Sequence, residues 1–224
     1  MAKKMFKLDS TQINFLKEFS KSPLKNQFYW TGGTALAYFH LQHRVSLDID
    51  FFSDEKFNYE DVIKFIRHFS QKYGLKNIEE KKIYDRWEFF LKNGKTIRVE
   101  FVHYDFKPLK SRKKWQDILI DSLDDMAANK TLAMIDRNEP KDIFDIYFLL
   151  TKSKFTPKKL LNLVKKKFGI DFSLSLFWAE ALTKAKRLSV LKPLLLTSNQ
   201  EKLINEIKKF IKNESVKTIK LLIE

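Results

Sequence analysis

The alternation of apolar and polar residues in the first half of the chain predicts helices and short strands in turn. Asp9 is a suitable N-cap for an amphipathic helix that runs to about Ser20. A short apolar run at residues 27–31 predicts a buried strand, and the glycine pair that follows it predicts a break. The next predicted elements are a helix over residues 34–42 and a strand over residues 46–52.

An amphipathic helix and a β-hairpin are expected next. Residues 58–73 carry apolar side chains at helical spacing, and Gly74 is a typical stop. Residues 86–92 and 95–103 have the pattern of two strands, and Asn93-Gly94 between them is a favoured two-residue turn.

From about Ser122 the apolar period changes to that of a helix and stays there. Ser198-x-x-Glu201 has the form of a capping box that opens one of the last helices. The helices expected in this part cover residues 123–137, 140–150, 157–168, 173–188 and 198–213, with a further helix closing the chain. The predicted fold class is therefore α+β: a mixed β-sheet with flanking helices in residues 1–110, followed by a helical domain in residues 111–224.

Composition narrows the class of protein. The chain has 224 residues, of which 44% are hydrophobic, so it can bury a sizeable core. No apolar run is long enough to span a membrane, and the N-terminus lacks the apolar stretch of a secretory signal. We therefore expect a cytoplasmic protein without a membrane partner. The absence of cysteine excludes disulfides, thiolate metal sites and a cysteine nucleophile.

The net charge is uneven along the chain. It totals +15, and residues 151–224 contribute 17 basic against 6 acidic side chains, or +11. A basic segment of this kind favours a polyanionic partner such as nucleic acid. The lysines expected to form an acceptor surface are Lys158, Lys159, Lys165, Lys166 and Lys167. A compositional bias toward lysine, spread over a solvated surface, is the alternative.

Gly32-Gly33-Thr34, between a predicted strand and a predicted helix, is the first candidate site. Backbone N–H groups at a helix start bind phosphate oxygens, and glycine lets the phosphate approach closely. Glycine pairs are also common in ordinary turns, so this motif alone leaves both interpretations open.

Three acidic residues form a sharper pattern. Asp48 and Asp50 are two apart on a predicted strand, so both carboxylates point to the same side. Adjacent carboxylates in an apolar strand are costly unless a cation joins them, and Mg²⁺ prefers such oxygen ligands. Glu100 is a lone acid in an alternating strand, where it could complete the metal site. The alternatives are a strand end whose acids reach water, and a surface pair of Glu100 with Arg98.

The last candidates lie on the predicted helices. Lys130 and Arg137 are seven residues apart and share one helix face, and Asp142 and Asp145 are three apart on the next helix. A lysine near carboxylates could hold a triphosphate. The alternative is a salt bridge between the two helices. The four histidines form no recognisable metal set, and we expect His40 and His43 at the surface.

Together these motifs resemble the nucleotidyltransferase superfamily, and more closely the AbiEii/AbiGii-type toxin nucleotidyltransferases. Residues 30–36 are similar to that family's Gly-Gly-Thr-Ala-Leu opening, and residues 44–50 to its Arg-x-Ser-x-Asp-Ile-Asp motif. Residues 128–137 and 141–147 are similar to its Ala-x-Lys-x-x-Ala and Arg-Asp-x-x-Asp-Leu-Tyr segments. The four motifs occur in the family's order over residues 28–150.

The resemblance implies a nucleotidyltransferase-like sheet and a role for each matching residue. Asp48, Asp50 and Glu100 would bind Mg²⁺, Lys130 would contact the triphosphate of an NTP, and Asp145 would complete the catalytic site, for instance as a base. The residues expected to bind the nucleotide are Gly32, Gly33, Thr34, Arg44, Ser46, Arg137 and Asp142.

Two hypotheses from different classes follow. The first is an Mg²⁺-dependent enzyme that moves a nucleoside monophosphate from an NTP to an acceptor such as tRNA or another RNA. Since the family contains toxins, this hypothesis includes a toxin–antitoxin or phage-defence role and a cognate antitoxin as partner. The second is a non-catalytic nucleic-acid or partner-binding module that keeps the fold. The side-by-side carboxylates favour the enzyme, because a binding module has no need to retain them.

Overall fold

The computed structural model describes residues 5–223. Within strands and the last helix, the side chains of residues 76–78, 93, 95, 219 and 221–223 are not described. The contacts divide the chain into two compact units. The sheet unit comprises Lys7–His40 and Ser46–Ser122, and the helical unit comprises the N-terminal segment ending at Phe6, the short segment Leu41–Val45 and the chain from Leu123 onward.

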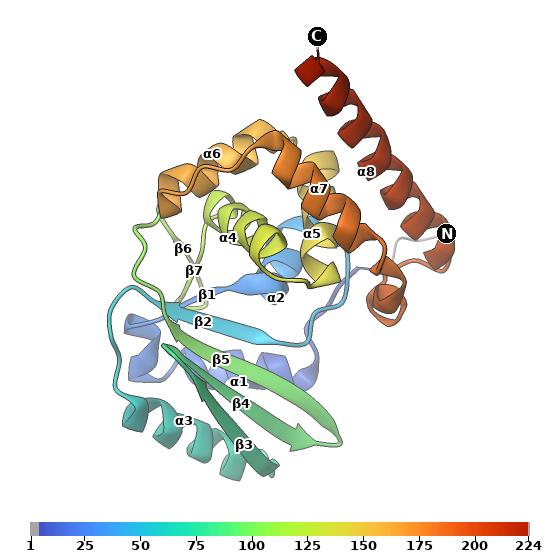
Figure 1. The fold of residues 1–224 in the computed structure, drawn as a ribbon. Coiled ribbons are helices and arrows are strands. Elements are labelled where there is room, and N and C mark those ends of the chain that lie inside the picture. The colour runs from blue at the N-terminus through green and yellow to red at the C-terminus, as the bar shows by residue number, and fades with distance from the viewer. Residues whose placement is uncertain (1–4, 224) are drawn as a thin grey trace. The chain divides into compact units, whose positions relative to one another are not determined.

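The described part of the sheet unit forms a seven-stranded mixed sheet in the order β3-β4-β5-β2-β1-β7-β6, seen in Figure 1. At its centre, β2 runs parallel to β5 and antiparallel to β1. The strands are β1 (Tyr29–Thr31), β2 (Ile49–Ser53), β3 (Lys76–Ile83), β4 (Arg86–Asn93), β5 (Lys95–His103), β6 (Lys113–Trp115) and β7 (Ile118–Ile120).

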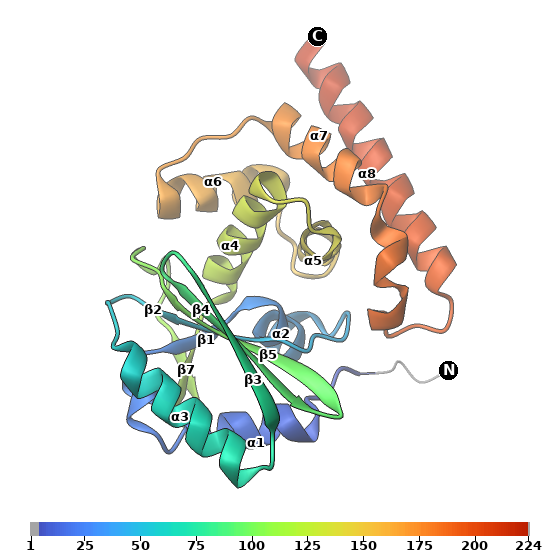
Figure 2. The same cartoon turned by 60° about the horizontal axis from the view of Figure 1, so that its bottom comes forward.

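Two amphipathic helices, α1 (Ser10–Phe19) and α3 (Tyr59–Lys72), cover one face of this sheet, as both Figure 1 and Figure 2 show. A cluster of phenylalanines fills the space between them and the strands. Phe19 of α1 stacks on Phe51 of β2 with ring centroids 3.8 Å apart, and Phe51 stacks on Phe101 of β5 at 5.6 Å. Because strand side chains alternate, the residues next to Phe51 and Phe101 point to the opposite face.

The predicted helices of this unit and the antiparallel pairing of the two hairpin strands are confirmed, but Asn93 pairs with Lys95, one residue out of the expected register. Asp9 caps α1 in a capping box with Gln12, and Asn58 caps α3. The helix expected after the glycine pair is α2 (Gly32–Leu36), which continues as a π-helical turn over Ala37–Leu41.

Three strands were not expected from the sequence. β3 is rich in lysine and glutamate and forms an edge of the sheet, so its residues lack the apolar alternation that predicts a strand. β6 and β7 have three residues each, too few to show a period. Because these two strands belong to the sheet, the sheet unit ends at Ser122 and not at the expected boundary after residue 110.

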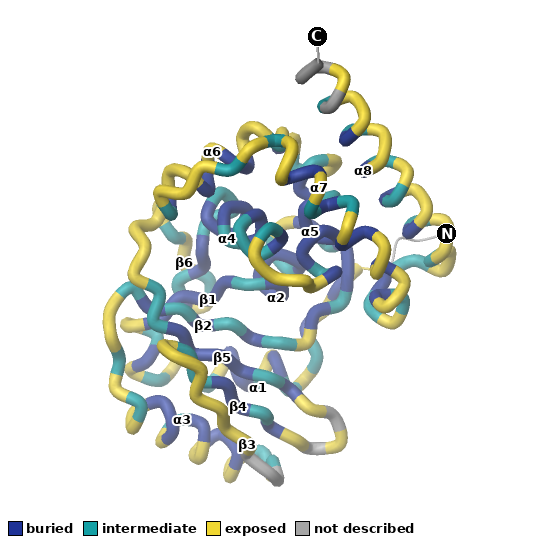
Figure 3. Tube along the Cα trace, viewed as in Figure 1, coloured by how far each residue is buried: buried dark blue, intermediate teal, exposed yellow. Residues whose placement is uncertain are grey.

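In the helical unit, five α-helices are described: α4 (Leu123–Asp136), α5 (Pro140–Lys152), α6 (Pro157–Phe168), α7 (Leu174–Ala185) and α8 (Gln200–Ile223). The expected capping box at Ser198 and the expected break after residue 213 are both wrong. The helix starts at Gln200, with the side chain of Asn199 accepting from the Lys202 N–H, and α8 runs on as one helix. Figure 3 shows buried and exposed positions alternating along it.

The segment Leu41–Val45 joins this unit by backbone contacts. Val45 N–H donates to the Leu194 carbonyl at 2.8 Å, and Arg44 forms a β-bridge with Leu195 just after the 3₁₀ helix Leu188–Leu194. Over the described residues, none of the helices combines the length and the apolar character that a membrane span needs.

Candidate active site

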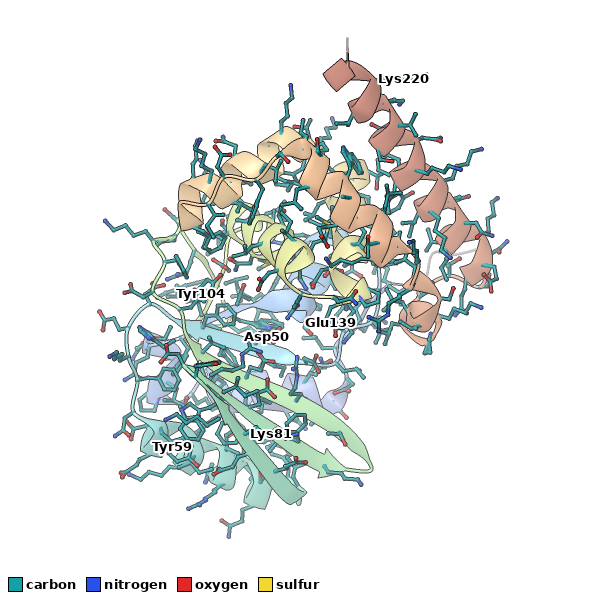
Figure 4. The ribbon with its side chains drawn as sticks, in the orientation of Figure 1. Asp50, Tyr59, Lys81, Tyr104, Glu139 and Lys220 are labelled. Atoms are coloured by element: carbon teal, nitrogen blue, oxygen red, sulfur yellow. The ribbon has the colours of Figure 1, made fainter. Side chains whose placement is uncertain are left out.

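Three carboxylates lie side by side on the sheet face opposite α1 and α3. Asp50 of β2, labelled in Figure 4, is in register with Glu100 of β5. Glu100 is in turn opposite Glu88 of β4. Neighbouring strands are about 4.8 Å apart, so the three side chains form a continuous row. The structure therefore brings together Asp50 and Glu100, as expected, and adds Glu88, which the sequence analysis missed.

Two arginines balance part of this negative charge. Arg98, two residues before Glu100 on the same face, lies 2.7 Å from Glu100 and 3.0 Å from Asp48. It also lies 3.7 Å from Glu88. Arg86 lies 3.5 Å from Glu88 and 3.9 Å from Glu100. The pair of Arg98 with Glu100, the alternative raised by the sequence, is thus present, but it belongs to a larger cluster in which Glu100 is buried and Arg98 is partly exposed.

The ionisation of Glu100 is strongly perturbed. Burial of its side chain, followed by the nearby negative charge of Asp50, raises the pKa of this carboxyl to about 7, against the opposing effect of Arg98 and Arg86. At neutral pH the cluster is therefore under electrostatic stress, which a bound cation would relieve.

The glycine motif is packed directly against these carboxylates. Gly32 has a φ of +76°, and a Cβ atom at this position would lie 1.8 Å from the Asp50 Oδ2. Only glycine allows this backbone conformation and this close approach together. Thr34 is buried, and its hydroxyl donates to the Asp48 carbonyl oxygen, so the side chain fixes the segment that carries Asp48.

The other residues of the two N-terminal motifs also have defined places. Gly33 is buried as the second residue of α2. Ser46 is buried, and its carbonyl oxygen accepts from the Gln12 side chain at 3.1 Å. This bond ties the segment before Asp48 to α1.

A second charged cluster lies inside the helical unit around Asp145 of α5. Arg44 contacts this carboxylate through two nitrogens, at 2.7 and 2.9 Å. Lys130 of α4 lies 3.0 Å from it, and His43 Nε2 lies 2.7 Å from it. All four residues are buried, so His43 is not the surface residue that the sequence suggested.

Asp142 is the second carboxylate of this cluster. It accepts from Lys130 at 3.0 Å and from Arg137 at 2.8 and 3.1 Å. The salt bridge between helices, which the sequence left as an alternative for these residues, is therefore formed, and Lys130 connects Asp142 to Asp145. Of the candidate residues, the sheet unit brings together Asp48, Asp50 and Glu100 and adds Glu88. The helical unit brings together Arg44, Lys130, Arg137, Asp142 and Asp145 and adds His43.

Asp145 has the electrostatics of a structural anion. Burial alone would raise the pKa of its carboxyl, but Arg44 and Lys130 outweigh it and, with the hydrogen bonds from His43 and Arg44, hold the pKa well below its usual range. An efficient general base has a pKa near the working pH. This geometry therefore suits Asp145 to positioning Arg44 and Lys130.

Comparison with known proteins shows to which family the chain belongs. The family described as the nucleotidyl transferase AbiEii toxin of a type IV toxin–antitoxin system matches residues 14–215. The chain belongs to the AbiEii nucleotidyl transferase toxin family. The expectation drawn from the four motifs is confirmed, and with it the assignment of the chain as a nucleotidyltransferase that transfers a nucleoside monophosphate.

This AbiEii protein is also similar to a curated relative in sequence and to solved structures in fold. An uncharacterized protein of Aquifex aeolicus (strain VF5) is 33% identical over 175 residues, which is 76% of this chain and 81% of the relative. JHP933 from Helicobacter pylori has a TM-score of 0.58 at 19% identity, covering 96% of this chain and 98% of that one. MenT4, a nucleotidyltransferase toxin from Mycobacterium tuberculosis H37Rv, has a TM-score of 0.51 at 13% identity, covering 90% and 81%. The two structures show the shared fold and confirm the predicted α+β class.

Proposed function

We propose that this nucleotidyltransferase uses Mg²⁺ at Asp48 and Asp50 to transfer a nucleoside monophosphate from an NTP to an RNA acceptor, with tRNA as the first acceptor to test. The observation that carries the proposal is the like-charged pair of Asp50 and Glu100, which lie opposite each other on adjacent strands although their repulsion raises the pKa of Glu100. As a toxin, the protein would act in a toxin–antitoxin or phage-defence system, and a cognate antitoxin would be its partner.

The carboxylate row fits a divalent cation by charge and by donor type. With Asp48, which Arg98 joins to the row, four carboxylates stand against Arg86 and Arg98, and the formal charge is −4 + 2 = −2. Across residues 5–223, no group of three His, Asp or Glu side chains stands close enough together to hold a metal alone. Mg²⁺ commonly takes one or two protein carboxylates and completes its shell with water and phosphate oxygens. Bound there, Mg²⁺ would neutralise charge on the phosphates during transfer.

The residues of the chain have separate tasks in this proposal. Asp48 and Asp50 bind the metal, and Glu100 stands beside them as a further oxygen donor. The backbone N–H groups at Gly32 and Gly33 would donate to the phosphate oxygens, while Thr34 holds Asp48 in place. These contacts orient the NTP for attack by the acceptor hydroxyl.

Lys130 and Arg137 supply positive charge for the triphosphate in this proposal. Both are bonded to Asp142 in the structure, and Lys130 is bonded to Asp145 as well. A lysine ammonium has three N–H donors and an arginine guanidinium has five, which suits both kinds of side chain to phosphate oxygens. Replacing Lys130 with methionine is expected to raise the KM for NTP at least tenfold.

The exposed face of α6 is the acceptor surface in this proposal. At 3.6 residues per turn its exposed lysines fall within one arc of the helix, and α6 contains no acidic residue. These lysines are Lys158, Lys159, Lys165 and Lys166. Lys167, which the sequence analysis placed in the same surface, is buried and lies 2.7 Å from Asp125, so it is withdrawn from this role.

The decisive experiment measures label transfer from each of the four NTPs, supplied with Mg²⁺, to purified tRNA and to total RNA. Wild-type protein should label RNA, and Asp48→Asn and Asp50→Asn should abolish labelling while remaining folded. Glu60→Gln, which removes an exposed carboxylate on α3, is the matched control and should keep full activity. Labelling that survives both Asp variants or chelation of the metal would refute the proposal.

The acceptor surface needs its own test. Reversing the four exposed α6 lysines to glutamate should weaken RNA binding and flatten its dependence on salt, by about 0.7 in the log–log slope for each lost contact. NTP binding should be unchanged. The control reverses four exposed lysines on α8, namely Lys209, Lys212, Lys217 and Lys220. Equal losses in both variants would show that general charge, and not the α6 face, attracts the RNA.

A further inference from the structure

The segment that leads into β6, in the sheet unit, is strongly basic. Five of the eight residues 107–114 are lysine or arginine, and none is acidic. Arg112 is engaged inside the unit, where it binds Asp54 through two nitrogens. The four lysines of the segment are exposed, and among the described side chains neither Lys113 nor Lys114 has an acidic partner. The charge of these two lysines is therefore directed to the solvent.

Next to this charge lies a group of aromatic rings. Trp115, the last residue of β6, packs against Trp30 of β1 and against two rings of the π-helical turn after α2. Its ring centroid lies 5.7 Å from that of Trp30, 5.8 Å from Tyr38 and 5.6 Å from Phe39. Trp30 is buried, whereas the other three rings are partly exposed. We call Tyr38, Phe39 and Trp115 the aromatic patch.

The strand geometry of β6 places a lysine beside the aromatic patch. Because strand side chains alternate, Lys113 and Trp115 point to one face of β6 and Lys114 points to the other. β6 is an edge strand, so both lysines stand at the rim of the sheet. Asp117, the first acid after the segment, is turned to another partner and lies 3.5 Å from Lys25. The rim thus combines flat rings with positive charge.

The aromatic patch is also near the glycine motif. Phe39 follows Gly32 by seven residues, which corresponds to about 10 Å along a helix axis. A π-helical turn such as the one that carries Phe39 is uncommon in proteins and is frequent at functional sites. A nucleic-acid strand that lies on the patch could therefore follow α2 toward the phosphate-binding glycines.

From this arrangement we infer that the aromatic patch, with Lys113 and Lys114, binds an unpaired segment of the RNA acceptor. The inference rests on the acceptor being RNA, as proposed above. Bases stack on Phe39 and Trp115, and phosphates of the same segment lie near the two lysines. Stacking needs base faces that a duplex keeps covered, so this site selects single-stranded RNA. The lysines of α6, in contrast, would contact phosphates alone.

Fluorescence polarisation of the full-length protein tests the site with a labelled single-stranded RNA of about 12 nucleotides and with the same sequence as a duplex. Wild type should bind the single strand more tightly. Trp115→Leu keeps an apolar side chain but removes the rings, and it should weaken single-strand binding by about tenfold. Trp115→Phe should restore most of the affinity. Tyr84→Leu, which removes an aromatic ring that is 93% exposed at the turn after β3, is the control.

The two lysines are tested by reversing both to glutamate. This variant changes only exposed side chains, so it answers the question even if thermal unfolding shows that Trp115→Leu does not fold. The log–log dependence of single-strand binding on salt should flatten by about 0.7 for each lost phosphate contact. Lys56 and Lys64, which are exposed elsewhere in the sheet unit, are reversed in the control and should leave the slope unchanged.

The outcomes separate this inference from the proposed transfer. Asp50→Asn should bind the single strand like wild type, so a loss of label transfer in that variant leaves the inference standing. No binding of the single strand, equal affinity of wild type for strand and duplex, or equal affinity of Trp115→Leu and Trp115→Phe would each overturn it. Equal losses in the two lysine variants, or equally strong competition by a polyglutamate peptide, would overturn it as well.

Discussion

Replacing Glu100 with glutamine should make the protein more stable, although it removes a charged residue that pairs with two arginines. The carboxyl is buried on the central strand β5 and faces Asp50 across the parallel pair with β2. Its pKa is raised from 4.5 to about 7, first by burial and then by Asp50. The native state therefore binds a proton at Glu100 more tightly than the unfolded chain does.

The magnitude follows from linkage. A carboxyl whose pKa is higher in the folded state does not lower the free energy of unfolding below pH 4.5, where both states are protonated. It lowers the free energy of unfolding by its full amount above about pH 7. A difference of about 2.5 in pKa corresponds to about 3.4 kcal/mol as an upper limit. Glutamine resembles the protonated carboxyl, so we expect Glu100→Gln to raise the free energy of unfolding by about 2–3 kcal/mol at pH 8.

Urea denaturation at a series of pH values measures this effect. Three of the four tryptophans, at positions 30, 87 and 115, belong to the sheet unit, so fluorescence follows the relevant part of the chain. The gain over wild type should shrink as the pH falls from 7 to 4.5 and vanish below it, while Glu60→Gln should show no such dependence. A Glu100→Gln protein that is no more stable than wild type at pH 8, or whose gain is independent of pH, would refute the reasoning.

Three further predictions concern substitutions that should lower the free energy of unfolding. Gly32→Ala should lower stability by about 1–2 kcal/mol through its positive φ and should displace the Asp50 carboxylate, so that transfer activity falls as well. Asp145→Asn should lower the free energy of unfolding, followed by circular dichroism, by about 3–5 kcal/mol, because it removes the charge that pairs with buried cations. The stabilisation by the Asp145 charge is present above pH 3.8 and fades as the pH falls through the lower folded pKa. Lys167→Met should cost a similar amount, about 3–5 kcal/mol, in thermal unfolding, since it takes the ammonium away from the buried Asp125, whereas an exposed α6 lysine changed to methionine should be neutral.

The pair of Asp50 and Glu100 could be predicted from the sequence because two simple rules apply to it. Strand alternation assigns each residue to a face, and the apolar neighbours of each acid indicate which face is the core. Phe51 and Phe101 do point into the phenylalanine cluster, so the acids point away from it. Parallel pairing of β2 with β5 then places the two acids in register.

Glu88 was missed because the register of the hairpin differs by one residue from the predicted one. A two-residue turn at Asn93-Gly94 would pair residue 92 with residue 95, and so place Glu88 opposite Val99. In the structure Asn93 pairs with Lys95, and Glu88 is opposite Glu100. A slip of one residue exchanges the two faces of a strand relative to its partner, so the turn chemistry alone could not have placed this acid.

Buried charge was the other feature that the pattern could not show. His43 and Lys167 look like surface residues in the sequence, since each is polar and stands next to a basic residue. Their partners, Asp145 and Asp125, are 102 and 42 residues away in the chain. A charged side chain can be buried when it is paired, and pairing over such separations depends on the packing of helices and not on any local period.

The two clusters therefore shift the pKa of a carboxyl in opposite directions, and this difference affects which residue can act as a general base. In the sheet unit, carboxylates outnumber arginines and the pKa of Glu100 rises, so this cluster attracts a cation or a proton. In the helical unit, Arg44, Lys130 and Arg137 outnumber Asp142 and Asp145, and the pKa of Asp145 falls, so that cluster attracts an anion. A group that accepts the proton of an attacking hydroxyl must bind that proton near neutral pH. Asp145 is poorly suited to this step, and the sheet carboxylates are the better place to look for the base.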